Sequence, residues 1–292
     1  SGRVESAARL AWDDGQLAVA IDDLRTAFDP EAPISVELEK SLVRARRVGV
    51  CLAADRAGNA VVFGEVERSL RQADRGLIEE SPAPVWAGIA TREQRVEMLH
   101  GAALEIAREA RFLGLGTVLF ALDAEGGFHF DRFDAGIPLG HSVVELCTGL
   151  DLVELQLRLA AGERMPDEAL RVQPSGSAME ARLFAVGKSE GEKGSALLSE
   201  LRWPSMPSSK FRLETDLAAG TAVLTGGGFP AARITAYGAT RYRALLALDR
   251  ALAETVIKPL RTNLAFLRKI LADDSFRAGQ YDETFAERIA NG

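Results

Sequence analysis

The chain has 292 residues, which is enough for one large domain or two modest ones, and its 47% hydrophobic and 26% charged residues are typical of a globular protein. Its 35 basic and 42 acidic residues leave a net charge of −7, which gives nucleic-acid binding no electrostatic support. With two cysteines, no apolar run of about 18 residues and no signal peptide, we expect a cytoplasmic protein without a disulfide framework, a nucleic-acid partner or a membrane partner.

The first part of the chain alternates between helical and strand patterns. Apolar residues at helical spacing predict a helix over 13–28, which an aspartate at its start would cap. The segment 46–67 predicts two strands joined by an Ala-Gly-Asn turn. The segment 91–114 predicts an amphipathic helix that Thr91 caps and Gly114 ends.

The rest of the chain continues this mixture. The segment 116–133 predicts a hairpin around a four-residue turn, and 142–163 predicts a helix that is broken in two near a glycine. The segments 191–198 and 204–209 have the composition of irregular loops, and 241–290 predicts helices with a break near its Asp-Asp-Ser-Phe. Strands and helices in this uneven order favour an α+β fold with an antiparallel or mixed sheet.

Four stretches of the chain resemble one family of enzymes. They are GEVERSLRQADRGLIEESPAP (64–84), GLGTVLFALD (114–123), TGLDLVELQLRLAAGE (148–163) and GSAMEARLFA (176–185). Each resembles the corresponding stretch of biotin carboxylases, which are ATP-grasp enzymes that carboxylate biotin. The third, for example, resembles T-G-I-D-L-V-E-L-Q-L-R-I-A-A-G-E. The resemblance covers nearly all of the chain.

The resemblance implies an ATP-grasp-like α+β fold in two parts. Residues 1–42 resemble a remnant of the family's lid subdomain. Residues 43–292 resemble its C-terminal domain, in which a mostly antiparallel sheet is flanked by helices. The family's N-terminal domain has no counterpart in this sequence. Because the chain also begins with Ser-Gly instead of methionine, we expect it to be a fragment of a longer polypeptide.

The resemblance also locates the family's metal ligands. Such an enzyme holds ATP over two divalent cations, and because Mg²⁺ prefers hard oxygen ligands the family uses two glutamates and an asparagine on adjacent strands. The matching positions hold Leu119, Arg132 and Asp134. A leucine offers no ligand, an arginine repels a cation, and Asp131 and Asp134 flank Arg132 as possible ion-pair partners. We therefore expect no metal and no cofactor, with ATP and Mg²⁺ bound only if the domain is active.

The bicarbonate end of the implied site has changed in the same way. The family's R-I-Q-V-E-H-P resembles GIPLGHS at 136–142. Gly136, Pro138 and Gly140 thus replace an arginine, a glutamine and the general-base glutamate. Without a base and an anion clamp, bicarbonate is not activated.

The positions that the family uses for the nucleotide and for biotin have also changed. Its glycine-rich lid matches RVESAAR (3–9), which has no glycine to let backbone amides approach phosphates. Its Tyr-Asp-Ser-Met-Ile-Gly-Lys matches GGFPAAR (227–233). A histidine, a glutamate, a second histidine and a lysine of the family are replaced, respectively, by Arg47, Gly49, Asp74 and Gly76.

Three functional matches survive. Glu39 and Lys40 match the adenine hinge, and Arg212 matches the arginine near the reacting biotin. Each also has a simpler interpretation. Glu39 and Lys40 can be a solvated pair, and Arg212 can be an ion-pair partner of Glu214 or of another carboxylate.

The remaining titratable candidates suggest no separate site. His100, His129 and His141 are too scattered along the sequence to indicate a metal site. Cys51 and Cys147 fall in apolar surroundings, which favours buried packing residues over nucleophiles.

Residues that pack are kept in this chain and residues that react are changed. We therefore expect a catalytically inactive biotin-carboxylase-like domain, uncertain as an enzyme, with a structural or subunit-association role in a biotin-dependent carboxylase of the acyl-CoA type. Its expected partners are other domains or subunits of that carboxylase, a biotin-carrier domain, or a second copy.

Two alternatives stay open at this point. The first is an active ATP-dependent carboxylase or ligase whose rebuilt site centres on Asp131, Arg132, Asp134 and Arg212. The second is a regulatory module in which Arg132 and Arg212 bind a small anion.

Overall fold

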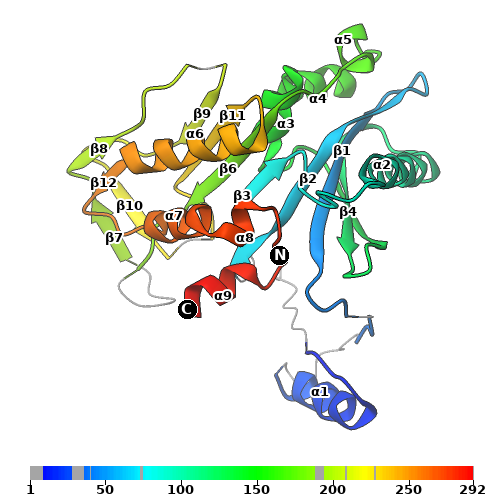
Figure 1. Ribbon diagram of the computed structural model, residues 1–292, viewed down its shortest axis with the longest axis horizontal. Coiled ribbons are helices and arrows are strands. Elements are labelled where there is room, and N and C mark those ends of the chain that lie inside the picture. Colours follow the sequence, from blue (N-terminus) through cyan, green and yellow to red (C-terminus); the bar gives the residue numbers. More distant parts are fainter. Residues whose placement is uncertain are drawn as a thin grey trace. The chain divides into compact units, whose positions relative to one another are not determined.

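The structure is a computed structural model of the chain, shown in Figure 1. It describes residues 9–27, 36–39, 41–72, 75–187, 194–207, 209–226 and 228–291. The chain divides after Val43 into two compact units.

The first unit contains helix α1 (Asp14–Ala27). The backbone N–H of Gln16 donates a hydrogen bond to Asp13 Oδ1 at 2.8 Å, so an aspartate caps the first turn as the sequence predicts. Ala20 is buried in this unit, and the short stretch 36–39 is exposed.

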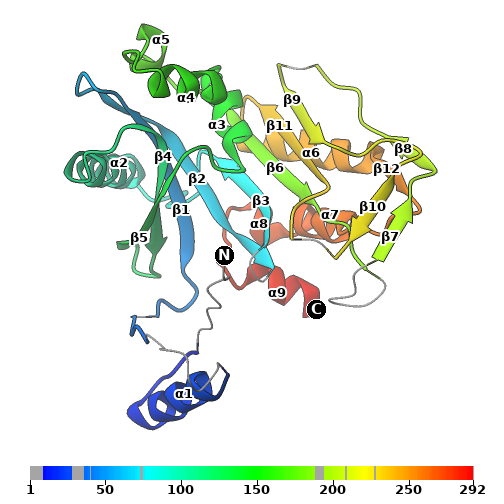
Figure 2. The same ribbon diagram turned by 180° about the vertical axis from the view of Figure 1, so that it is seen from behind.

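The described residues of the second unit form an eight-stranded sheet in the order β5-β4-β1-β2-β3-β6-β11-β9. Its strands are β1 (Arg46–Ala54), β2 (Ala60–Gln72), β3 (Arg75–Ser81), β4 (Gly114–Leu122), β5 (Phe128–Ala135), β6 (Ser177–Leu183), β9 (Phe211–Thr215) and β11 (Ala232–Gly238). Every neighbouring pair is antiparallel, which confirms the predicted sheet type. Two ribbons pair β7 (Gly194–Leu197) with β10 (Ala222–Thr225) and β8 (Glu200–Arg202) with β12 (Val256–Lys258). Figure 2 shows both ribbons at the end of this unit where β9 and β11 lie.

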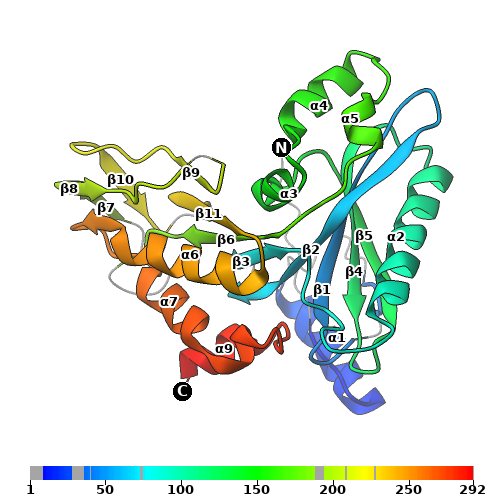
Figure 3. The same ribbon diagram turned by 45° about the horizontal axis from the view of Figure 1, so that its top comes forward.

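Helices cover both faces of the sheet, as Figure 3 shows. They are α2 (Arg92–Glu109), α3 (His141–Thr148), α4 (Leu152–Ala160), α5 (Asp167–Leu170), α6 (Arg241–Glu254), α7 (Leu264–Ala272), α8 (Asp274–Arg277) and α9 (Phe285–Asn291). Helices α6 and α7 share a core with one face of β6 and β11, whereas α3 lies over the other face of these strands and α4 packs beside β4. None of the described helices is long and apolar enough to cross a membrane.

Alternation along β6 and β11 decides which side chains face which helix layer. Met179 and Ala181 of β6 and Ile234 and Ala236 of β11 are fully buried in the core that contains α6 and α7. Because successive side chains of a strand point to opposite faces, the residues between them point toward α3. These intervening residues are polar, and they make the candidate site.

Buried charges attach the C-terminal segment to the sheet. Arg241 of α6 donates to the fully buried Glu80 of β3 through Nε at 2.6 Å and through Nη2 at 2.9 Å. The Tyr281 hydroxyl donates to the same carboxylate, and Arg46 donates to the carbonyl of Gly279 at 2.8 Å. The segment that leads to α9 is therefore part of the fold of the second unit.

The structure confirms several predicted elements. The hairpin at 116–133 is β4 and β5, and the helix predicted over 142–163 breaks at Gly149, whose φ is 75°. Helix α2 is shorter than predicted because Arg111 has a left-handed φ of 49°, so the helix ends at Glu109 and Gly114 begins β4. The Thr91 side chain makes no capping hydrogen bond.

Two short strands contradict the structure predicted for their segments. Residues 194–197, predicted as loop, form β7, while 191–193 lie outside the described residues. Residues 256–258, predicted within a helical tail, form β12. Both strands pair with segments distant in sequence, and such partners leave no mark in a local pattern.

Candidate functional site

Two rows of polar side chains cross the face of the sheet that α3 covers. Residues opposite each other in antiparallel register share a face, so the register identifies the rows. The first runs from β3 to β9 through Glu79, Glu180, Thr235 and Arg212. The second runs from β6 to β9 through Arg182, Arg233 and Glu214. Together they make a polar layer between the sheet and α3.

Arg212, the surviving match near the biotin position, pairs with α3. Its Nη1 forms an ion pair with Glu145 Oε2, and the Glu145 side chain is only 2% exposed. The other carboxylate oxygen of Glu145 accepts a hydrogen bond from the Leu152 backbone N–H at 2.8 Å. Arg212 therefore neutralises a buried carboxylate of α3, and this partner, Glu145, was not identified from the sequence.

Arg233 and Glu214 form the second ion pair under α3. Arg233 Nη2 pairs with Glu214 Oε2, and its Nη1 donates to the carbonyl oxygen of Leu139. The Ser142 hydroxyl donates to Glu214 Oε1 at 2.7 Å. The carboxylate of Glu214 is thus shared between β11 and α3.

His141 lies beside this pair. Its Nδ1 is 3.0 Å from the carbonyl oxygen of Pro138, and its Nε2 is 4.0 Å from Glu214 Oε1. Burial lowers the pKa of His141, and the charges of Arg233 and Arg212 lower it further, although the hydrogen bond to Pro138 opposes both. The imidazole is therefore held in its neutral form at neutral pH.

Three residues of the two rows join Arg68 of β2 in a buried group of charges on β2, β3 and β6. We call Arg68, Glu79, Glu180 and Arg182 the ion cluster. Arg182 donates through Nε to Glu180 Oε1 at 2.9 Å and places Nη2 2.8 Å from Glu79 Oε1. Arg68 Nε donates to the same Glu79 oxygen at 3.2 Å. Burial acts to raise the pKa of Glu79, but Arg182 and Arg68 hold it below its ordinary value.

The positions that were expected to match the family's metal ligands hold a guanidinium–carboxylate ion pair instead. Leu119 of β4 is buried and lies opposite Arg132 of β5 in the register. Arg132 pairs with Asp134 Oδ1 at 3.0 Å and with Asp131 Oδ2 at 3.2 Å, and Arg47 also approaches Asp131 at 3.4 Å. The remaining carboxylates thus already have guanidinium partners. Among the described residues, no group of three or more His, Cys, Asp or Glu side chains could hold a metal ion.

The structure does not unite the four residues of the proposed rebuilt centre. Strands β5 and β9 are the edges of the described sheet, and six strands lie between them. Arg132 pairs with aspartates of its own strand, whereas Arg212 pairs with Glu145 of α3. No contact among the described residues joins Arg132 to Arg212.

The other candidates from the sequence lie apart. Glu39 is exposed in the first unit, and Lys40 lies outside the described residues, as do Asp74, Gly227 and residues 3–8. His100 contacts Glu65 at 3.0 Å and His129 contacts Asp123 at 2.8 Å, so the three histidines have three different partners.

Both cysteines are buried, as the sequence predicts. Burial raises the pKa of Cys51 and of Cys147 to about 12, which keeps both thiols protonated and unreactive. They pack in one hydrophobic cluster with residues of α3 and α4.

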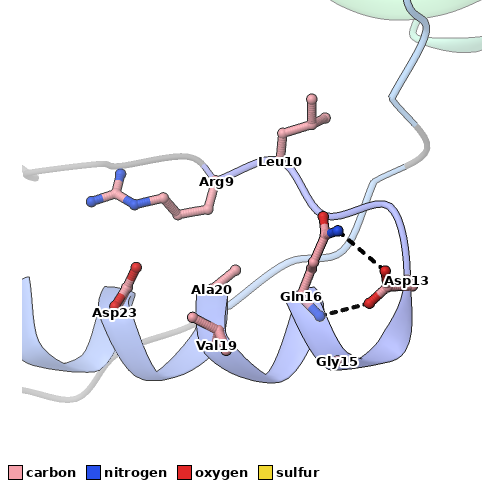
Figure 4. Close-up of a pocket in the computed structure, with 8 residues that line it drawn as sticks. All are labelled: Arg9, Leu10, Asp13, Gly15, Gln16, Val19, Ala20 and Asp23. Atoms are coloured by element: carbon pink, nitrogen blue, oxygen red, sulfur yellow. Dashed lines mark hydrogen bonds between the residues drawn. The ribbon is translucent and has the colours of Figure 1, made fainter.

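Two hollows lie away from the polar layer. One, of about 460 Å³, runs along α1 and is lined by residues from Arg9 to Asp23; Figure 4 shows Gln16 and Asp13 hydrogen-bonded at its end. The other, of about 360 Å³, lies beside β10 and includes Leu217 and Phe229. Neither is lined by a residue of the two polar rows.

The ion cluster was not predicted from the sequence, although the sequence contains a signal for it. Glu180 and Arg182 stand two residues apart in Ser-Ala-Met-Glu-Ala-Arg-Leu, a strand that is otherwise apolar or small. Charges at alternate positions of a buried strand must face partners, because unpaired buried charges are too costly. The pattern could have indicated a polar face on β6, but the partner Arg68 could not be read from it.

Comparisons with known proteins agree on one family. Residues 8–168 match the family model described as carbamoyl-phosphate synthase L chain, ATP binding domain, and residues 180–288 match the biotin carboxylase C-terminal domain. The chain is 32% identical over 271 residues to the α subunit of mitochondrial methylcrotonoyl-CoA carboxylase from Rattus norvegicus, covering 92% of this chain and 37% of that protein. It is 30% identical over 254 residues to the biotin carboxylase of Allochromatium vinosum, covering 87% of this chain and 55% of that protein.

Solved structures show the same fold. The biotin carboxylase of Campylobacter jejuni matches with a TM-score of 0.81 and 22% identity over 94% of this chain and 59% of that one. The urea carboxylase of Kluyveromyces lactis matches with a TM-score of 0.74 and 29% identity over 82% of this chain and 21% of that one. The chain therefore spans between about a fifth and three fifths of these relatives.

Proposed function

Since this chain belongs to the biotin carboxylase family, we propose that it is a catalytically inactive biotin-carboxylase-like domain with a structural or subunit-association role in a biotin-dependent carboxylase of the acyl-CoA type. Arg132 at an expected metal-ligand position is the observation that carries the proposal. An arginine at this position supports the loss of metal binding and of catalysis. The packing residues that still match the family support a role in assembly.

The guanidinium of Arg132 opposes a divalent cation directly. At about 4 Å and an effective dielectric constant of about 20, a doubly charged cation and a guanidinium repel by roughly 8 kcal/mol. Leu119 supplies no oxygen, and Asp134 is engaged by Arg132 at 3.0 Å. Mg²⁺ needs several hard oxygen ligands in a near-octahedral arrangement, and this pair of strands does not offer them.

The polar layer under α3 supports the same conclusion. A site for bicarbonate or phosphate needs cationic groups with charge to spare. Arg212 pairs with Glu145 and Arg233 pairs with Glu214, so each guanidinium has an internal carboxylate. Glu79 is a poor candidate for a replacement base, because two arginines lower its pKa.

The relatives indicate what kind of assembly the domain would join. One is the α subunit of a carboxylase, and one solved relative is a complete multifunctional pyruvate carboxylase from Rhizobium etli. We infer that this domain contacts another domain or subunit of such an assembly, a biotin-carrier domain or a second copy. Its two free cysteines suit a reducing compartment such as the cytoplasm.

Titration with ATP tests the proposal. Isothermal titration calorimetry of the chain with ATP, in the presence and absence of Mg²⁺, should give no micromolar, Mg²⁺-dependent binding. The biotin carboxylase of Allochromatium vinosum provides a positive control under the same conditions. Tight Mg²⁺-dependent binding by this chain would favour the alternative of an active carboxylase or ligase with a divergent site.

A further inference from the structure

Strand β10 has an open edge. On one side it pairs with β7, from Ala222 opposite Leu197 to Thr225 opposite Gly194, as Figure 2 shows for the two strands. Among the described residues, no further hydrogen bond reaches the backbone of residues 222–225 from the other side. An open strand edge carries unpaired N–H and C=O groups, so it is a template for pairing with another chain.

The edge strand β5 of the large sheet is protected in ways that β10 is not. It carries Asp131, Arg132 and Asp134, and its register with β4 shifts between Leu119 and Phe120. Charges and bulges of this kind keep an edge from pairing with another chain. Strand β10 has the sequence Ala-Val-Leu-Thr, without charge or proline, and its register with β7 is unbroken.

The side chains around the open edge are apolar and exposed. Leu224 is 79% exposed, Leu197 is 64% exposed and Phe229 is 83% exposed. Leu224 and Phe229 also line the hollow of about 360 Å³ beside β10, and among the described residues of that lining Asp216 is the one that carries a charge. Apolar surface gathered in this way marks an interaction site on a globular protein.

The sequence of this edge is self-complementary. Thr221-Ala222-Val223-Leu224-Thr225 reads almost the same in both directions from Val223. In an antiparallel pair about a twofold axis at Val223, Thr221 faces Thr225 of the partner subunit, Ala222 faces Leu224 of the partner subunit, and Val223 faces its own copy. Facing residues lie on one side of a sheet, so Leu224 stays on the exposed side and Val223 on the side of the small core behind the ribbon.

A second copy of this chain is the occupant that the pattern fits. Every facing pair is uncharged, and each combines either a large with a small side chain or two β-branched side chains, which pack well across strands. The chain has a net charge of −7, so two copies repel each other least where their surfaces carry no charge.

We propose that β10 pairs antiparallel with β10 of a second copy, centred on Val223. The pairing joins the two ribbons into one sheet in the order β7-β10-β10-β7. On its exposed side, Leu197, Ala222 and Leu224 of the partner subunit form a row, which the twofold axis repeats. The paired strands are short and the interface is small, so the dimer is weak. This inference rests on the proposed function and deepens it, because it names the partner and the surface of association.

Sedimentation equilibrium of the whole chain tests the pairing. The wild type should associate to a dimer as its concentration rises from about 1 to about 500 µM, a range that covers weak interfaces. Leu224→Lys and Ala222→Glu each place a charge against an apolar side chain, so each should raise the dissociation constant at least about tenfold. Leu157→Lys on α4 is the matched control, because Leu157 is 67% exposed and lies outside the ribbon, and it should associate like the wild type.

A mixture of the two variants tests the register. When a Leu224→Lys chain pairs with an Ala222→Glu chain, the two opposite charges face each other, and the other facing pair is the original alanine and leucine. The mixed dimer should therefore form at least about threefold more tightly than the dimer of either variant alone. Both positions are exposed, so the variants should melt like the wild type; if one does not fold, the other still tests the surface.

Three results would overturn the proposal. They are a wild-type chain that stays monomeric over the whole range, which would leave the edge to a different partner; single variants that associate like the wild type; and a mixture that associates no better than its components. None of these changes the ATP titration, so failure of the pairing is distinguishable from failure of the proposed function.

Discussion

Replacing Glu180 by glutamine should remove a pH-dependent part of the protein's stability. Glu180 is fully buried on β6, with Glu79 and Thr235 opposite it on the neighbouring strands. Burial raises the pKa of Glu180 from 4.5 to about 7, although the charges of Arg182 and Arg233 oppose the rise. Glutamine has nearly the same shape and no charge at any pH, so the variant isolates the titration of this one group.

The sign and size of the effect follow from linkage. Between the unfolded pKa of 4.5 and the folded pKa of about 7, the folded protein holds a proton that the unfolded chain has lost. The contribution of Glu180 to stability is therefore fully present below pH 4.5 and is lost as the pH rises through 7. The gap between the two pKa values corresponds to roughly 3 kcal/mol, most of which falls between about pH 5 and 8.

Urea denaturation at several pH values from about 5 to 8 measures this effect. The free energy of unfolding of the wild type, minus that of Glu180→Gln, should fall by roughly 2–3 kcal/mol over this range. Glu154→Gln on the exposed side of α4 gives the baseline for the same substitution at the surface. A difference for Glu180→Gln that stays constant within about 0.5 kcal/mol, or that rises with pH, would refute the reasoning.

Three further outcomes are expected. The variant Leu119→Glu, Arg132→Glu and Asp134→Asn, which restores the family's metal ligands on β4 and β5, should fold and bind Mg²⁺ more tightly than the wild type in calorimetry. It should show no bicarbonate-dependent ATP cleavage, because the base and the anion clamp are still absent. Cleavage by this variant would contradict the reasoning. Arg241→Met should lower the free energy of unfolding in urea by roughly 3–5 kcal/mol, because it leaves the buried carboxylate of Glu80 without its ion-pair partner. Arg250→Met, on the exposed face of α6, should change it by less than about 1 kcal/mol. Equal losses of stability in the two variants would argue against a strong contribution from the buried pair. The two buried thiols should react with a disulfide reagent only as fast as the protein unfolds, and rapid labelling of the native protein would show that they are accessible.

Local patterns were sufficient where structure depends on neighbours in sequence. The hairpin of β4 and β5 follows from alternating apolar residues around a short turn, and the break at Gly149 follows from the left-handed backbone that glycine adopts readily. The end of α2 was misplaced because Arg111, and not a glycine, adopts the left-handed conformation that terminates it. A residue that rarely has positive φ gives no such warning in the sequence.

The resemblance located residues of the candidate site along the sequence, but it did not show which side chains contact one another. The resemblance named Arg212 and Gly140, yet the carboxylate that pairs with Arg212 belongs to Glu145, which is 67 residues earlier on α3. The closeness of Gly140 to Glu79 likewise depends on how the segment before α3 lies over β3. Such pairs are set by tertiary packing, which a one-dimensional pattern does not contain.

The most direct test of the central proposal is ATP cleavage by the wild-type chain with bicarbonate and free biotin. Phosphate release is followed in the presence of Mg²⁺, with each of the two substrates omitted in turn and with the biotin carboxylase of Allochromatium vinosum assayed in parallel. We predict that this chain releases no phosphate above background under any of these conditions. Release that requires both bicarbonate and biotin would contradict the proposal that the domain is catalytically inactive.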